Sequence, residues 1–264
     1  MALITLLSDF GLIDPYIAEM KGVILSVNPD QKIVDVSHGI ERHNIAMGSF
    51  VLETALPYFP DGSIHVAVVD PGVGTERLPL VVLCERGILV GPDNGLLVRA
   101  AERLGLKAAY QIDSHRFEGE KVSSTFHGRD VFAGTAAKLA NGLNPHSVGA
   151  EVKQLLKLDV PNLSISHGRA NCTALYVDSF GNVILNLVEE DITRLGVHVG
   201  DHVTIQTKQG QFPGLVGRTY SDISYAQIGV IPGSQGHLEI AIREGSAAAR
   251  LGLKPLDQIE VRLS

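Results

Sequence analysis

The order of apolar segments in the first 160 residues is the feature that most constrains the fold of this 264-residue chain. Short apolar runs typical of strands alternate with segments whose apolar residues recur at helical spacing. In the first helical segment, Asp14-Pro15 supplies an N-cap and a proline at the first helical position, and the helix is expected to end at Asn28. The alternation predicts an open α/β sheet with helices on both faces. The expected strands are 3–7, 32–36, 63–69, 78–84, 87–90 and 108–112. The other expected helices are 44–56, 95–104 and 129–141.

The pattern changes after about Pro161, where short strand-like runs follow one another at turn-like spacing. This texture is typical of a small β-barrel or sandwich. We therefore predict an N-terminal α/β domain at 1–160 and a C-terminal β domain at 170–264, with a linker near 158–168. The expected strands of the second domain are 174–177, 183–187, 202–206, 227–231, 238–242 and 258–262, with short helices at 189–195 and 247–251.

Charge and cysteine content narrow the function classes. The formal net charge of −7 argues against a nucleic-acid binder, which needs a basic face. Cys84 and Cys172 lie in apolar runs, so we expect core thiols in a reducing cytoplasm. The N-terminal residues lack a basic region, and no apolar run approaches the ~20 residues of a membrane span. We expect neither a signal peptide nor a membrane segment.

Several catalytic signatures are missing from the sequence. It has no P-loop, no G-x-S-x-G nucleophile elbow and no H-E-x-x-H zinc motif. Gly72-Val73-Gly74 lacks the third glycine of a dinucleotide fingerprint and the helix that should follow it. His198 and His202 are four residues apart, but Gly200-Asp201 between them indicates a turn. We expect no metal site.

Two carboxylates follow strands of the predicted sheet. Asp9 comes just after the first strand and Asp70 just after the third. If these strands are parallel, both carboxylates lie at the same sheet edge, where ligands bind in open α/β folds. Each precedes a glycine-containing turn that would let a ligand approach the backbone closely. The alternative is that both residues merely cap turns.

Three further segments carry polar groups. Arg77 follows Asp70 by seven residues and could fold back to pair with it, although such a residue is more often a solvated surface charge. His127 precedes a predicted helix, where the dipole disfavours the imidazolium, although a lone histidine in a loop is usually a surface residue. In the second domain, 178–182 combines Asp178, Phe180 and Asn182, and a plain hairpin turn is the alternative there.

These residues resemble the S-adenosylmethionine hydroxide adenosyltransferase family, the hydrolase relatives of the fluorinase and chlorinase. The resemblance runs in order from the first strand to near the C-terminus and covers nearly the whole chain. The segments that carry it are Ser8-Asp9-Phe10-Gly11, Met20-Lys21-Gly22, Val34-Asp35-Val36-Ser37-His38, Val69-Asp70-Pro71-Gly72-Val73-Gly74, Gly91-Pro92-Asp93-Asn94-Gly95, Phe126-His127-Gly128-Arg129-Asp130, Asp178-Ser179-Phe180-Gly181-Asn182 and Gly233-Ser234-Gln235-Gly236.

The resemblance implies an N-terminal α/β domain and a C-terminal β-barrel. It also implies a homotrimer whose active sites lie between one subunit's N-terminal domain and its neighbour's barrel. Family hydrolases resemble this chain in a set corresponding to Asp70, Arg77 and His127. Halogenases have a Tyr in place of Asp70 and a Tyr-Ser pair in place of His127-Gly128. Fluorinases also carry a long insertion where this chain has only Glu85-Arg86-Gly87.

The reaction implied is attack of water or hydroxide on C5′ of S-adenosylmethionine, giving adenosine and L-methionine. Arg77 cannot readily act as a base, because its pKa exceeds about 12. We therefore expect Arg77 to stabilise the nucleophile, Asp70 to fix Arg77, and His127 to be the more plausible proton acceptor. The implied reaction needs no cofactor and no metal.

Binding roles also carry over from the resemblance. Asp9 would accept hydrogen bonds from the ribose hydroxyls, and Asn182 would read the adenine edge. Gln235 stands where halogenases have an Arg near the methionine carboxylate, and His43 stands where fluorinases have a Trp. The remaining expected contacts are the aromatic adenine walls Phe180 and Tyr220, the backbone near Ile242 and Glu244, and an ammonium site of Asp14, Asp178 and Ser234.

Two other functions remain open from the sequence. A sensor that binds S-adenosylmethionine or adenosine would need no set like Asp70, Arg77 and His127. A halide-using adenosyltransferase would form 5′-chloro-5′-deoxyadenosine when chloride is added. Product analysis with and without halide therefore separates the three hypotheses.

Overall fold

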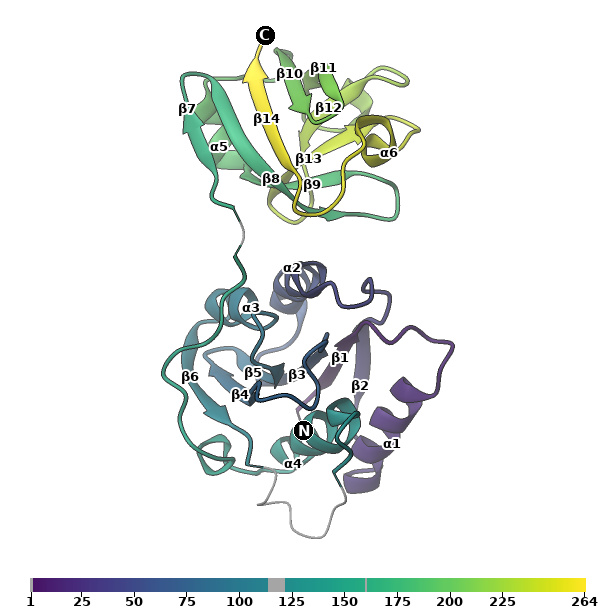
Figure 1. The fold of residues 1–264 in the computed structure, drawn as a ribbon, viewed down its shortest axis with the longest axis vertical. Coiled ribbons are helices and arrows are strands. Elements are labelled where there is room, and N and C mark those ends of the chain that lie inside the picture. Colours follow the sequence, from purple (N-terminus) through teal and green to yellow (C-terminus); the bar gives the residue numbers. More distant parts are fainter. Residues whose placement is uncertain (1, 114–121, 160) are drawn as a thin grey trace. The chain divides into compact units, whose positions relative to one another are not determined.

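The chain folds into two compact units, residues 1–158 and 159–264. A computed structural model describes residues 2–113, 122–159 and 161–264 (Figure 1). Met1 and position 160 of the predicted linker lie outside the described residues. The first unit is a mixed α/β sheet domain and the second is a closed β-barrel, which confirms the predicted fold class.

The first unit alternates strands and helices as the apolar pattern predicts. Its short 3₁₀ helices are η1 (Leu56–Tyr58) and η4 (Pro145–Ser147). The other elements in order are β1 (Ile4–Ser8), α1 (Tyr16–Val27), β2 (Ile33–Ser37), α2 (Ile45–Ala55), β3 (Ser63–Val68), β4 (Pro79–Cys84), β5 (Gly87–Pro92), α3 (Val98–Arg103), β6 (Leu106–Gln111), η3 (Gly128–Ala133) and α4 (Gly134–Ala140).

Within the described residues, the first unit has one six-stranded sheet in the order β2-β1-β3-β5-β4-β6. β1 pairs in parallel with both β2 and β3, and β3 pairs in parallel with β5. The predicted hairpin makes β4 antiparallel to β5. The carboxyl ends of β1 and β3 therefore meet at one edge, because Ser8 is in register with Val68.

Helices cover both faces of this sheet (Figure 1). Successive strand residues point to opposite faces, so Leu6 and Leu7 of β1 belong to different cores. Leu6 packs in the core that contains Met20 of α1 and residues of α4. Leu7 packs in the core that contains Leu52 of α2 and residues of α3. Apolar runs on nearly every strand suit a sheet that is buried on both sides.

The predicted helix bounds are wrong in three places. Pro15 occupies the N-cap of α1 without any side-chain cap, so Asp14 does not cap the helix and the first helical residue is Tyr16. α3 is shorter than the predicted 95–104, because Gly95 has a left-handed φ of 92°. The predicted helix 129–141 begins instead as the π-helix η3, whose N-cap is His127.

The second unit consists of short strands and two short α-helices. Among the described residues of both units, no helix has the length and apolar character needed to cross a membrane. The elements are β7 (Ser164–Ser166), β8 (Arg169–Val177), β9 (Val183–Val188), α5 (Glu189–Leu195), β10 (His202–Thr207), β11 (Gly210–Val216), η5 (Tyr220–Asp222), β12 (Ile228–Pro232), β13 (His237–Ile242), α6 (Ala247–Leu251) and β14 (Gln258–Leu263).

The described strands β14-β10-β11-β12-β13-β9-β8 close into a barrel, because β14 pairs with β8 as well as with β10. Closure leaves no free edge among these strands, and β7 adds to β8 outside the ring. Inward residues such as Leu185, Ile205 and Ile240 form the core. The sequence analysis missed β7 and β11; β11 contains Pro213 and Gly214, which disfavour a strand assignment.

A buried histidine of the first unit makes its stability depend on pH. His65 on β3 is 2% exposed, and burial lowers its pKa to about 4. Between pH 6.5 and 4, His65 is protonated in the unfolded chain but neutral in the folded state. The free energy of unfolding therefore decreases as the pH is lowered through this range. The loss reaches about 3 kcal/mol and is absent above pH 6.5. His65→Gln should remove this component in urea unfolding at pH 4.5 to 7.5; an unchanged pH dependence would contradict the assignment.

Candidate active site

Asp9 and Asp70 lie at the shared carboxyl edge of β1 and β3. The parallel pairing of these strands confirms the expected placement. Asp9 is buried, and its Oδ2 accepts a hydrogen bond from the backbone N–H of His43 at 2.9 Å. His43 adopts a left-handed φ of 65° to present that N–H. Within the described part of the chain, no protein donor is seen for Oδ1 of Asp9.

Arg77 folds back onto Asp70, so the surface-charge alternative is wrong. Its Nε lies 3.0 Å from Oδ1 and its Nη2 lies 2.5 Å from Oδ2 of Asp70. The two side chains are only 8% and 5% exposed. The turn between them needs glycine at position 74, where φ is 80° and an added Cβ would lie 2.8 Å from the carbonyl oxygen of Ser124. The result is a bidentate ion pair largely shielded from water.

His127 contacts the same guanidinium nitrogen, Nη2, that donates to Oδ2 of Asp70. Nη2 of Arg77 lies 2.8 Å from Nδ1 of His127. Because Arg can only donate, Nδ1 must be the accepting nitrogen, and the proton of the neutral ring must lie on Nε2. Burial, together with the positive charge of Arg77, lowers the pKa of His127, and the charges of Asp70 and Asp130 oppose that shift. His127 is therefore a neutral ring with a donor at Nε2.

An aromatic cluster joins the Asp9 turn to the His127 turn. The rings of Phe10, Tyr16 and Phe126 pack pairwise with centroids 5.2 to 5.8 Å apart. Phe10 directly follows Asp9, and Phe126 directly precedes His127. The edge-on packing of these rings fixes the two turns relative to each other. Asp9, Asp70, Arg77 and His127 thus form one polar cluster at one sheet edge.

Asn94 supports the cluster from a neighbouring turn. Its side-chain Nδ2 donates to the carbonyl of Val69 at 2.8 Å, and its Oδ1 accepts from the N–H of Leu96. Val69 precedes Asp70, so the amide of Asn94 fixes the backbone that carries the carboxylate. The motif at 91–95 therefore has a positioning role that its sequence alone did not indicate.

The barrel has a hollow of about 500 Å³ that gathers five predicted binding residues. The aromatic side chains of Phe180 and Tyr220 are 79% and 44% exposed. Exposed aromatic faces beside a hollow suit a flat heteroaromatic ligand. The five residues are Phe180, Asn182, Tyr220, Ile242 and Glu244.

Asp178 holds the turn that carries two of these residues. Its Oδ1 accepts from the N–H groups of Phe180 and Asn182 at 2.9 and 2.8 Å, and its Oδ2 accepts from Nδ2 of Asn182 at 3.0 Å. The segment is thus both a hairpin turn and part of the hollow. Asp14 and Ser234, the other predicted ammonium ligands, are exposed in the first and second units. A joint ammonium site of these three residues stays a prediction.

Glu239 is a hydrogen-bond partner of the hollow's Tyr220 that the sequence analysis missed. It is buried on β13 and accepts the hydroxyl proton of Tyr220, whose oxygen accepts in turn from Nδ2 of Asn182. Burial and the carboxylate of Glu239 raise the pKa of Tyr220, and burial raises the pKa of Glu239. The signal in the sequence was a lone carboxylate inside the apolar run of β13.

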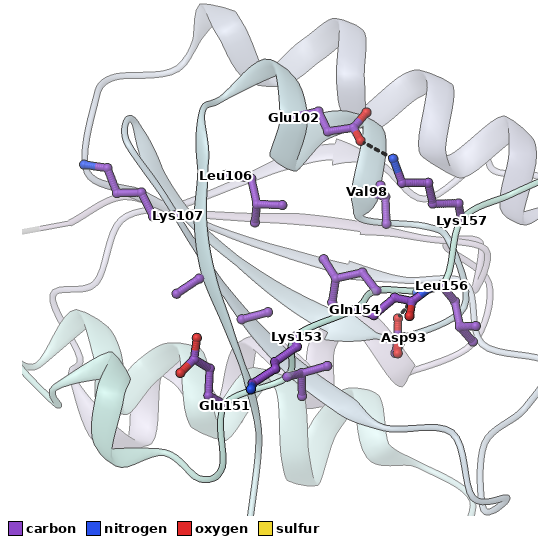
Figure 2. A pocket seen from close by; sticks show the side chains of 14 residues that line it. Asp93, Val98, Glu102, Leu106, Lys107, Glu151, Lys153, Gln154, Leu156 and Lys157 are labelled. Carbon is purple, nitrogen blue, oxygen red and sulfur yellow. Dashed lines mark hydrogen bonds and ion pairs between the residues drawn. The ribbon is translucent and has the colours of Figure 1, made fainter.

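A larger hollow, about 1010 Å³, lies elsewhere in the first unit (Figure 2). It runs between α3, β6 and the segment 151–157, and none of the predicted site residues lines it. Three of its charged groups are paired in the hollow itself. Lys157 lies 2.6 Å from Glu102, and Asp93 accepts from the N–H of Leu156 at 2.9 Å. The polar cluster and the barrel hollow, in contrast, contain the residues that the sequence analysis singled out.

The sequence was compared with models of known protein families, and both domains of one family match it. The S-adenosylmethionine (SAM) hydroxide adenosyltransferase N-terminal domain matches residues 4–149, and the C-terminal domain of the same family matches residues 172–260. The chain belongs to the SAM hydroxide adenosyltransferase family. The two matches fall within the two structural units, and the expected resemblance is confirmed.

Full-length relatives carry one recurring name. A protein from Methanocaldococcus jannaschii named (R)-S-adenosyl-L-methionine hydrolase is 38% identical, with 98% of this chain and 95% of that protein covered. One from Salinispora tropica with the same name is 36% identical, with 98% and 97% covered. A fluorinase from Nocardia brasiliensis is more distant, at 26% identity with 99% and 97% covered.

A solved structure has the same fold. The crystal structure of an uncharacterized conserved protein from Thermotoga maritima matches this family member with a TM-score of 0.93 at 33% identity. The match covers 98% of this chain and all of that chain. The α/β unit followed by a barrel is therefore a fold that this chain shares with a solved structure over nearly its whole length.

Removing one partner of the Asp70–Arg77 ion pair should lower the free energy of unfolding far more than removing one partner of a surface pair. Asp70→Ala leaves the shielded guanidinium of Arg77 without its counter-ion, and we expect a loss of about 3 to 5 kcal/mol in the free energy of unfolding. Asp61→Ala is the matched control, because Asp61 pairs with Arg86 at 2.7 Å but is 72% exposed. Its cost should stay below about 1 kcal/mol. Urea unfolding followed by circular dichroism measures both, and equal costs would contradict the shielded pair.

Proposed function

We propose that this chain hydrolyses S-adenosyl-L-methionine by attack of hydroxide on C5′, giving adenosine and L-methionine. The observation that carries the proposal is the contact of Arg77 with both Asp70 and His127 at the sheet edge beside Asp9. The names of the full-length relatives support the same reaction. Because those names specify the (R) form, we propose the (R) epimer at the sulfonium as the preferred substrate.

The cluster suits the stabilisation of a small anion. The reaction forms a C5′–O bond and breaks the C5′–S bond, whose electrons leave with neutral methionine. Nη1 of Arg77 has no partner within the described residues, and Nε2–H of His127 is a second donor. Two preorganised donors lower the free energy of bound hydroxide relative to water, and the proton of the water leaves to solvent. In this proposal His127 donates to the nucleophile, which differs from the expectation that it accepts the proton.

The remaining contacts follow the family resemblance. Asp9 accepts hydrogen bonds from the ribose hydroxyls through its unoccupied oxygen, and the barrel hollow takes the adenine. Phe180 and Tyr220 supply its aromatic walls, while the backbone at Ile242 and Glu244 supplies further edge contacts. Asp14, Asp178 and Ser234 hold the methionine ammonium. An excess of carboxylates suits a cationic sulfonium. No step of the proposal calls on a metal or a cofactor.

We also propose a homotrimer in the cytoplasm, with each site shared between the first unit of one subunit and the barrel of another. Large apolar side chains near the proposed ligand contacts support an interface. Leu12 and Ile13, close to Asp9 in sequence, are 78% and fully exposed. Cys84 and Cys172 are buried free thiols, which suits a reducing compartment.

Product analysis tests the reaction directly. Incubation with S-adenosylmethionine in halide-free, ¹⁸O-labelled water should give adenosine labelled at its 5′-oxygen and unlabelled methionine. His127→Ala removes one of two donors to the nucleophile and should lower kcat by about 10²- to 10³-fold. The matched control is His198→Ala, since His198 is 84% exposed on the second unit.

Two outcomes would oppose the hydrolase, and a third would oppose only the role of His127. Tight adenosine binding without product would favour the sensor hypothesis. A requirement for chloride, with 5′-chloro-5′-deoxyadenosine as product, would favour a halide-using adenosyltransferase. Unchanged kcat in His127→Ala would remove His127 from the reaction.

The hollow should also distinguish adenosine from inosine. Both amide N–H groups of Asn182 are engaged, by Asp178 and Tyr220, so within the described residues its side-chain oxygen is the group left to meet a ligand. An accepting oxygen pairs with the 6-amino group of adenine and opposes the 6-oxo group of hypoxanthine. We expect adenosine to bind at least about tenfold more tightly than inosine. Asn182→Ala should bring the two affinities together in titration calorimetry; equal affinities in the unaltered protein would contradict this orientation of the amide.

A further inference from the structure

A chain of polar side chains behind Asp9 takes no part in the proposed reaction. Oγ of Ser8, the last residue of β1, lies 2.8 Å from Nδ1 of His38. Nε2 of His38 lies 3.2 Å from Oδ1 of Asp35, at an ion-pair distance without an aligned hydrogen bond. Asp35 in turn pairs with Nζ of Lys21 on α1 at 2.7 Å. Lys21, Asp35 and His38 belong to motifs that the sequence analysis singled out without giving them a task.

Burial excludes a catalytic role for these four side chains. The sequence of groups resembles a nucleophile, a base and an acid, but Ser8 is fully buried and the side chain of His38 is 2% exposed. A substrate could reach neither of them. Only Lys21 and Asp35, at the far end, are partly exposed. Any effect of this network on the site must therefore act through the backbone and side chains around it.

The nearest structure is the turn that presents Asp9. The carboxylate of Asp35 favours the ring proton of His38 on Nε2, so Nδ1 accepts the hydroxyl proton of Ser8. Oγ of Ser8 then accepts from the N–H of Phe10 at 3.3 Å. The carbonyl of His38 accepts from the N–H of Gly11 at 2.9 Å. His38 thus holds the turn at residues 8, 10 and 11, on both sides of Asp9.

Orientation matters at Asp9 because its two oxygens have different tasks. Oδ2 is occupied by the N–H of His43, and Oδ1 is left for the ligand. A carboxylate that meets two vicinal hydroxyls must be held in one orientation to pair with both. A turn that relaxes by a fraction of an ångström would keep the charge but lose that pairing.

We propose that His38 is a positioning residue for Asp9, and that it transmits the anchoring of Asp35 and Lys21 through Ser8 to the turn that binds the ribose hydroxyls. The inference rests on the ribose role of Asp9 in the proposed function. It adds β2 and α1 to the elements that determine recognition of the sugar.

The protein contains a matched control for this network. Thr5 lies on the same strand, and its Oγ1 lies 2.8 Å from Nδ1 of the buried His65. Both pairs join a β1 hydroxyl to a buried imidazole at the same distance. Thr5 sits in mid-strand, however, and has no turn to hold. Loss of His65 should therefore damage the core without altering recognition of the ribose.

The test compares adenosine with 2′,3′-dideoxyadenosine, which lacks the hydroxyls that Asp9 would bind. The full chain and its variants are titrated by calorimetry at pH 7.5, where circular dichroism verifies that each is folded. The unaltered protein should prefer adenosine at least about tenfold. His38→Ala should reduce that preference at least fivefold, mainly by weakening adenosine, while the Kd of the dideoxy compound changes less than twofold.

Conservative variants separate positioning from general damage. His38→Asn places an amide near the position of Nδ1 and should restore most of the preference. His38→Gln reaches toward Asp35 instead and should behave like His38→Ala. His65→Gln should keep the full preference for adenosine.

The outcomes distinguish this inference from the proposed function. If Asp9→Asn abolishes the preference for adenosine but His38→Ala keeps it, the positioning role is wrong and the ribose role of Asp9 stands. If the unaltered protein shows no preference, the ribose role fails and the inference fails with it. If His65→Gln loses the preference as His38→Ala does, the effect is general loosening of β1, and the positioning role is overturned.

Discussion

The guanidinium group of Arg77, held between a carboxylate and an imidazole, is the interaction on which the site depends. Asp70 supplies the counter-charge that allows a cation to remain 8% exposed at the sheet edge. One N–H of the same group fixes His127 as a hydrogen-bond acceptor at Nδ1 and a donor at Nε2. The donors that remain point to chemistry on a small anion, which matches the hydroxide that the family name specifies.

The first unit is built to bring these three residues together. Parallel pairing of β1 and β3 sets the edge, the glycine turn returns Arg77 to Asp70, and Asn94 anchors the backbone at Val69. The Phe10, Tyr16 and Phe126 rings join the turn of Asp9 to that of His127. The second unit supplies a different kind of site, an aromatic hollow whose polar groups are fixed by Asp178 and Glu239. The polar cluster of the first unit thus suits a charged group, and the aromatic hollow of the second unit suits a flat ring.

Local patterns predicted most of the elements and the shared edge of Asp9 and Asp70, because apolar periodicity and parallel pairing determine both. Spacing alone left the return of Arg77 open, since a seven-residue separation does not specify a turn. Closure of the barrel joins β14 to β8, about 90 residues apart, and no local signal encodes such a pairing. Glu239 was missed because it lies in an apolar strand, where only its partner Tyr220, 19 residues away, gives it meaning.

The protonation state of His127 tests the central assignment most directly. Nitrogen-15 NMR of the histidine-labelled protein, with the His127 signals assigned by their loss in His127→Ala, reports which ring nitrogen carries the proton. At pH 7 a neutral ring is expected, with Nδ1 unprotonated and Nε2 protonated, because Arg77 donates to Nδ1. A proton on Nδ1, in either a neutral or a charged ring, would contradict the contact with Arg77 and the proposed hydroxide site with it.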